Sequence, residues 1–254
     1  MQMVWITALG VGGATMIGAL LGLMVRRIPH RFNDAILGFA AGVMLAAAVL
    51  GLVVPSLEFG GVHGVWVTIA GVLTGALCLN VLDRVVPHLH SLAGVGSDHE
   101  THPEKTAAMN RVLLFVTAIA IHNLPEGIAA GVSFGTGNVA DAITVAGGIA
   151  LQNIPEGMVI IAPMLAAGIS RKRTLLIALG TGLFEVIGTL FGYAAVQVAT
   201  FILPFALAFA GGTMLYVISD EMIPETHAHG FERGATYALL IGFCVMLLMD
   251  FYLG

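Results

Sequence analysis

The sequence predicts an all-α polytopic membrane protein, a single transmembrane domain over residues 1–254 with eight transmembrane helices. Hydrophobic residues make up 58% of the chain, charged residues make up only 10%, and the mean hydropathy is +0.96. A water-soluble domain cannot bury that much apolar surface. The chain also has 33 glycines, and small residues let membrane helices pack closely.

The apolar residues fall into eight stretches of about 20 residues, the length that crosses a hydrocarbon core. Eight crossings place both termini on one side of the membrane and the odd-numbered connections on the other. All ten Lys and Arg residues lie in or beside those odd-numbered connections. By the positive-inside rule these connections are cytoplasmic, so we expect both termini outside the cytoplasmic (inner) membrane. The stretches are approximately 3–25, 34–57, 63–86, 110–134, 139–166, 173–199, 203–224 and 234–253.

The longest connection, 87–109, is a predicted cytoplasmic loop between the third and fourth helices. It carries four histidines, His88, His90, His99 and His102, among acidic residues. Histidine-rich tracts are candidates for metal binding by composition alone. An irregular polar loop explains the same residues, so both interpretations are open.

A hexapeptide in the fourth stretch carries metal-ligand chemistry inside an apolar segment. In His122-Asn123-Leu124-Pro125-Glu126-Gly127, the spacing places His122, Asn123 and Glu126 on one helical face. Imidazole nitrogen and carboxylate oxygen suit zinc and neighbouring divalent metals. Pro125 removes the N–H that would bond the carbonyl of Ile121 and predicts a kink. Such a freed carbonyl is tolerated in a membrane where protein or a water-filled cavity satisfies it.

The fifth stretch repeats the pattern with Gln152-Asn153-Ile154-Pro155-Glu156-Gly157. Both motifs begin about a dozen residues into helices that run in opposite directions, so a rise of roughly 1.5 Å per residue brings them to the same depth. Inverted repeats of broken helices that meet at the midplane build the substrate sites of secondary transporters. We therefore expect one shared site.

Glu185, about a dozen residues into the sixth stretch, is a third candidate carboxylate. Three carboxylates with His122 and the amides supply ligands for one metal ion, or for two that share a bridging glutamate, for which we favour Glu156. Helix-to-helix hydrogen bonding is an alternative role for the amides of Asn123, Gln152 and Asn153. Met44 offers a soft thioether, although packing explains it more simply.

Acidic and histidine residues nearer the helix ends are candidates for a transport pathway. An acidic funnel raises the local concentration of cations, but water-exposed helix ends explain these residues about as well. The candidates are Asp34, Glu58, Asp220, Glu221, Glu225, His227 and Asp250.

The two hexapeptides, Glu185 and the stretch Glu221-Met222-Ile223-Pro224-Glu225-Thr226-His227 resemble the ZIP family of divalent metal transporters, and more narrowly its bacterial GufA-like branch, over essentially the whole chain. The resemblance implies a 3+2+3 helix arrangement, outside termini, a histidine-bearing loop and metal moving toward the cytosol. It also implies a binuclear site. One metal would have Met44, His122, Glu126, Gln152 and Glu156, and the other Asn123, Asn153, Glu156 and Glu185. In some members an aspartate stands in the place of Asn153.

The expected function is a cytosol-directed carrier of zinc, with cadmium, iron and manganese as further candidate ions, that alternates access by moving a block containing the fourth and fifth helices. A selective metal channel is the nearest alternative, since it would use the same ligands. An intramembrane zinc enzyme would activate water, but the chain has no HExxH motif. We expect no enzyme activity, no cofactor and no nucleic-acid partner. Membrane lipid surrounds the chain, and a homodimer is one open oligomeric state.

Overall fold

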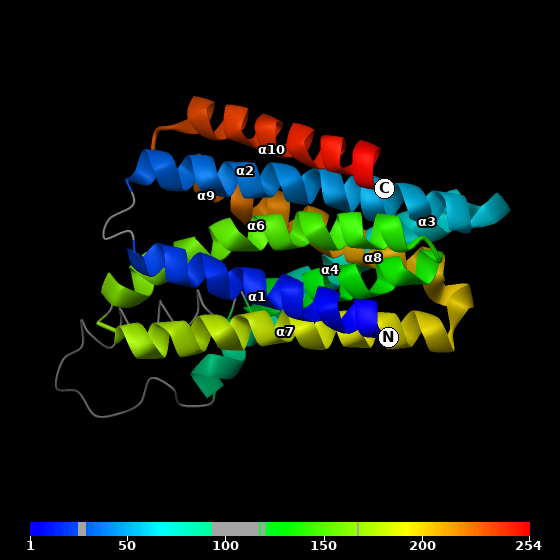
Figure 1. The fold of residues 1–254 in the computed structure, drawn as a ribbon, viewed down its shortest axis with the longest axis horizontal. Coiled ribbons are helices and arrows are strands. Elements are labelled where there is room, and N and C mark those ends of the chain that lie inside the picture. Colours follow the sequence, from blue (N-terminus) through cyan, green and yellow to red (C-terminus); the bar gives the residue numbers. More distant parts are fainter. Residues whose placement is uncertain (25–28, 93–116, 118–119, 167) are drawn as a thin grey trace.

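A computed structural model describes residues 1–24, 29–92, 117, 120–166 and 168–254, and every regular element in these residues is a helix. Seven of the described helices are long and apolar enough to cross a membrane. Residues 120–133 form a further helix whose predicted first residues, from 110, lie mostly outside the described part. The N- and C-termini lie at the same end of the bundle (Figure 1). Eight crossings and the 3+2+3 arrangement stay predictions, and the shared end of the termini fits an even number.

The predicted stretches match the observed helices closely in the second half of the chain. The predicted span 139–166 coincides with α6 (Val139–Ala166), which continues through Pro155. Part of the predicted loop 87–109 is instead helical, because α4 runs to Leu92 and places His88 and His90 on its last turns. The other elements are α1 (Gln2–Met24), α2 (His30–Ala48), η1 (Val49–Val53), α3 (Val54–Phe59), η2 (Gly61–His63), α4 (Gly64–Leu92), η3 (Phe134–Thr136), α7 (Arg171–Val198), η4 (Thr200–Ile202), α8 (Leu203–Val217), η5 (Ile218–Met222), α9 (Ile223–Thr226) and α10 (Glu232–Leu253).

The second and seventh predicted spans contain a π-helical turn that the sequence did not reveal. In the second span η1 precedes Pro55, and in the seventh η5 precedes Pro224. A proline has no N–H to donate to the carbonyl four residues earlier. A single π turn can accommodate this missing bond, and such turns are frequent at functional sites.

Glycine positions divide the described helices into two groups. In the first group, a Cβ at Gly157 of α6 would collide with the Thr15 carbonyl of α1, and a Cβ at Gly127 would collide with the Glu185 carbonyl of α7. Helices this close pack backbone to backbone. We call this group the site block: α1, the helix 120–133, α6 and α7. The remaining helices form the frame block: α2 with η1 and α3, α4, α8 with η5 and α9, and α10.

The frame block has close backbone packing of its own. A Cβ at Gly42 of α2 would meet the Leu239 carbonyl of α10, and one at Gly212 of α8 would meet the Val72 carbonyl of α4. The buried hydroxyl of Ser56 joins α3 to α4 and α8. It lies 2.7 Å from Thr68 Oγ1 on α4 and donates to the Pro204 carbonyl on α8 at 2.7 Å.

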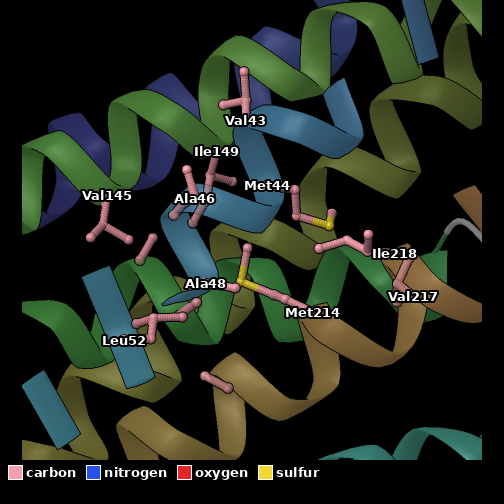
Figure 2. Packing of buried hydrophobic residues seen from close by; sticks show 14 of the residues in the cluster. Val43, Met44, Ala46, Ala48, Leu52, Val145, Ile149, Met214, Val217 and Ile218 are labelled. Carbon is pink, nitrogen blue, oxygen red and sulfur yellow. The ribbon is translucent and has the colours of Figure 1, made fainter. Parts of the chain in front are cut away.

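At the boundary between the two blocks, glycines face side chains of the other block. Described glycines that face the other block, such as Gly51 and Gly148, would meet the side chains of Val145 and Met246. A buried apolar cluster fills this boundary, and Figure 2 shows Met44 inside it, beside Ile218. The boundary therefore differs from the interiors of the two blocks, where helices pack backbone to backbone.

Candidate metal site

The first hexapeptide lies on the helix 120–133 and directs its polar side chains inward. His122, Asn123 and Glu126 are 7%, 1% and 2% exposed. Gly127 and Gly131 of this helix face the carbonyls of Glu185 and Thr189 on α7 with no room for a Cβ. The glycine that ends the motif therefore allows α7 to bring Glu185 to the ligand face.

Glu185 is fully buried and accepts hydrogen bonds from three different helices. Its Oε1 accepts from Asn123 Nδ2 at 2.6 Å and from Thr15 Oγ1 at 2.7 Å. Its Oε2 accepts from Asn153 Nδ2 at 2.6 Å. Donors on three helices therefore fix the position of this carboxyl group.

The two hexapeptides meet through Gln152 and Glu126. Gln152 Nε2 donates to Glu126 Oε1 at 2.8 Å, and both side chains are buried. Glu156 is partly buried and lies within electrostatic reach of His122 and Glu221, and Glu126 lies within reach of Glu156 and Glu185. The structure thus brings the polar residues of both motifs into one cluster with Glu185, as the sequence predicted.

Glu221, named from sequence only as a pathway candidate, lies directly against the cluster. Its Oε1 is 2.7 Å from Nε2 of His122, an ion-pair distance. The contact lacks the direction of a hydrogen bond, because Nε2 has no hydrogen-bond partner among the described residues. Glu221 belongs to η5 of the frame block, so this contact crosses the boundary between the blocks.

The donors of the cluster are used, but several of its acceptor atoms are not. Within the described part of the chain, four buried oxygens of the cluster have no hydrogen-bond partner: Asn123 Oδ1, Glu126 Oε2, Gln152 Oε1 and Asn153 Oδ1. His122 Nε2 also has no hydrogen-bond partner there, but it lies against Glu221 Oε1. Buried polar atoms without partners are costly. The amide N–H groups point to carboxylates while the carbonyl oxygens stay free, so a cation would satisfy atoms that the protein leaves unpaired.

The described residues contain no group of three His, Cys, Asp or Glu side chains already arranged around a metal ion. The amides of Asn123, Gln152 and Asn153 donate to carboxylates of the cluster. Met44 belongs to the apolar cluster. The binuclear arrangement stays a prediction.

The other pathway candidates lie at the two ends of the bundle. Asp220 and Glu225 are exposed, and Glu58 is exposed on α3. Asp250 of α10 lies within electrostatic reach of Asp141 of α6. Nδ1 of His227 is 2.8 Å from the Ile223 carbonyl. The loop histidines His99 and His102 lie outside the described residues.

Asp34 was a pathway candidate, and the structure gives it a partner that sequence reasoning missed. Its side chain is fully buried, and Oδ1 is 3.0 Å from Nδ1 of His229, whose ring stacks on His30 at 4.5 Å. Asp34 and His30 are one turn apart on α2, but only the fold brings His229 to them.

His229→Ala is expected to lower the free energy of unfolding by about 1–3 kcal/mol, since the second oxygen of buried Asp34 already lacks a partner among the described residues and the first would lose its own. Thermal unfolding of the purified protein in detergent measures the change. His63→Ala, at an exposed histidine, is the control, and equal stability of the two variants would contradict the prediction.

Thr15 is the other missed residue. Its position shows a signal that was available, because Val11, Thr15, Gly18 and Gly22 repeat at helical spacing and mark one small-residue face of α1. That face packs on α6, where Asn153 Nδ2 also reaches the Val11 carbonyl at 3.3 Å.

The chain is similar to known zinc transporters over most of its length. The family model described as ZIP Zinc transporter matches residues 88–250. The zinc transporter GufA of Myxococcus xanthus is 41% identical over 255 residues, which cover 98% of each chain. Zinc transporter ZIPB of Bordetella bronchiseptica is 40% identical, over 95% of this chain and 78% of its own. Zinc transporter ZupT of Chlorobium luteolum is 33% identical, over 93% and 92%.

Proposed function

The chain belongs to the ZIP zinc transporter family, and from that premise we propose that it carries zinc across the cytoplasmic membrane into the cytosol. It is an integral membrane transporter and not an enzyme. Its relatives named above are zinc transporters. Cadmium, iron and manganese are further candidate ions, because nitrogen and oxygen ligands alone do not fix the metal.

The cluster of unpaired ligand atoms is the observation that carries this proposal. Zinc would bind between the two hexapeptides, with His122, Glu126, Gln152 and Glu156 as its ligands. Glu126 Oε2 and Gln152 Oε1 are buried without hydrogen-bond partners among the described residues, and His122 Nε2 lies against Glu221 Oε1 without a hydrogen bond. Imidazole and carboxylate ligands are those that zinc accepts most readily in proteins. Met44 would be a further ligand only after leaving its apolar packing.

A second metal position would use Asn123, Asn153, Glu156 and Glu185. Both oxygens of Glu185 already accept hydrogen bonds from these two amides. The second position would therefore form only if those amides turned their free oxygens toward the metal. Zinc at the first position needs no such change at Glu185, so we propose that the first position is filled first.

We propose that transport proceeds by alternating access, in which the site block moves as one body against the frame block. Apart from Met44, every proposed ligand lies on the helix 120–133, on α6 or on α7, and close glycine contacts join these helices to one another or to α1. The contact of His122 with Glu221 crosses the boundary. Such movement would carry the zinc together with its ligands. It would also separate His122 from Glu221, which stays in the frame block. A channel is the alternative and would need a continuous wet path.

Zinc uptake into proteoliposomes tests the proposal. The purified chain should take up zinc faster than protein-free vesicles, and the rate should saturate with zinc concentration, as expected for a carrier. A competition panel with cadmium, iron and manganese ranks the ions. Uptake no faster than in protein-free vesicles would refute transport, and a rate that rises without saturation would favour the channel.

A further inference from the structure

Thr15 on α1 makes an unusual hydrogen bond for a helical threonine. Threonine hydroxyls inside helices commonly donate to a carbonyl one turn earlier on the same helix, and Thr181, Thr189 and Thr213 do so here. Thr15 does not. Its hydroxyl leaves its own helix and donates to Oε1 of Glu185 on α7 at 2.7 Å. The Val11 carbonyl, which Thr15 would otherwise use, instead accepts from Asn153 at 3.3 Å.

The main chain of Thr15 is also part of the site's construction. Gly157, the last residue of the second hexapeptide, packs against the Thr15 carbonyl so closely that no Cβ would fit. One residue therefore contacts α6 through its backbone and α7 through its side chain. Thr15 is 1% exposed, so no water replaces the hydroxyl if it is removed. Its position links the spacing of α1 and α6 to the orientation of Glu185.

We propose that Thr15 is a positioning residue for zinc transport, which fixes the Glu185 carboxylate together with the amides of Asn123 and Asn153. Without the hydroxyl, Oε1 keeps a single donor, Asn123. Glu185 then loses one of the three bonds that fix its orientation, while Glu126 and Glu156 lie within electrostatic reach of it. A change in its orientation would alter the charge distribution around the metal. All partners of Thr15 lie inside the site block, so the arrangement persists while that block moves.

This inference rests on the proposed zinc transport, and the test separates the two. Thr15→Val removes the hydroxyl and keeps the side-chain shape. It is expected to raise the KM for zinc uptake about tenfold, which corresponds to the loss of one hydrogen bond, and to change kcat less than twofold. Thr15→Ser retains the hydroxyl and should restore the KM to within twofold of wild type.

Thr181→Val is the matched control, because Thr181 is also buried on α7 but donates to the Ala178 carbonyl of its own helix. A normal KM for Thr15→Val, or a KM raised equally in Thr181→Val or in Thr15→Ser, would overturn the inference. If Thr15→Val does not fold, Thr15→Ala takes its place with the same expectations. Glu185→Ala provides a second arm, because it removes the oxygen that accepts from Thr15. In that background Thr15→Val should change zinc uptake no further, and additive effects would refute action through Glu185.

The proposed function fails separately. If the wild-type chain takes up no zinc, or if Glu156→Ala takes it up normally, transport through this site is wrong whatever Thr15 does. If wild type transports zinc, Glu156→Ala does not and Thr15→Val is unchanged, only the inference on Thr15 is wrong.

Discussion

Zinc uptake is expected to fall at least about 100-fold when Glu156 or His122 is replaced by alanine. Loss of a residue that merely supports a metal ligand typically costs 10–100-fold, and these two are proposed as ligands themselves. Glu156 is shared by both proposed metal positions, and it lies within electrostatic reach of His122. Removing either side chain deletes a ligand and leaves the remaining unpaired atoms without the cation that would satisfy them.

The measurement is initial zinc uptake into proteoliposomes, corrected for the amount of folded protein. Glu232→Gln, which neutralises an exposed acid in the first turn of α10, is the control for a general loss of negative charge and should transport normally. Undiminished uptake by Glu156→Ala and His122→Ala would show that zinc takes another route through the bundle.

Much of the fold could be predicted because hydropathy reports the length of each apolar segment directly. The bounds of α6 agree with the predicted span, and both termini lie at one end of the bundle. The π turns η1 and η5 could not be predicted in the same way. A proline in a helix can be accommodated by a kink, a break or a π turn, and which one forms depends on the packing around it.

In the candidate site, too, features set by helical spacing could be predicted and features set by packing could not. The motif residues could be named because each hexapeptide places its polar side chains on one helical face, and the structure assembles Asn123, Asn153 and Glu185 as a hydrogen-bonded group. The spacing of small residues on α1 marks the face that carries Thr15, but its bond to Glu185 could not be predicted, because a threonine in an apolar helix normally bonds to its own backbone. Glu221 was named as a pathway residue, but its contact with His122 depends on how η5 turns in space.

Gly188→Ala is expected to destabilise the protein by about 1–3 kcal/mol, the usual cost of overpacking, and to weaken zinc uptake. A Cβ at this position of α7 would lie 2.5 Å from the Leu124 carbonyl and 2.9 Å from the Ile128 backbone nitrogen. Neither atom is the end of a flexible side chain, so the helix 120–133 and α7 must move apart. Because Glu185 is one turn away on α7, its 2.6 Å bond with Asn123 would lengthen.

Gly180→Ala on the same helix is the matched control, since no described atom lies within 4 Å of a Cβ there. Both substitutions raise helix propensity equally, so any difference between them reports the space around the methyl group. Gly188→Ala should lower the temperature of thermal unfolding in detergent and raise the KM for zinc uptake. Gly180→Ala should change neither quantity. If the two variants behave alike, the close approach of α7 to the first hexapeptide does not hold Glu185 in place. If only stability falls, the approach supports the fold without setting the geometry of the site.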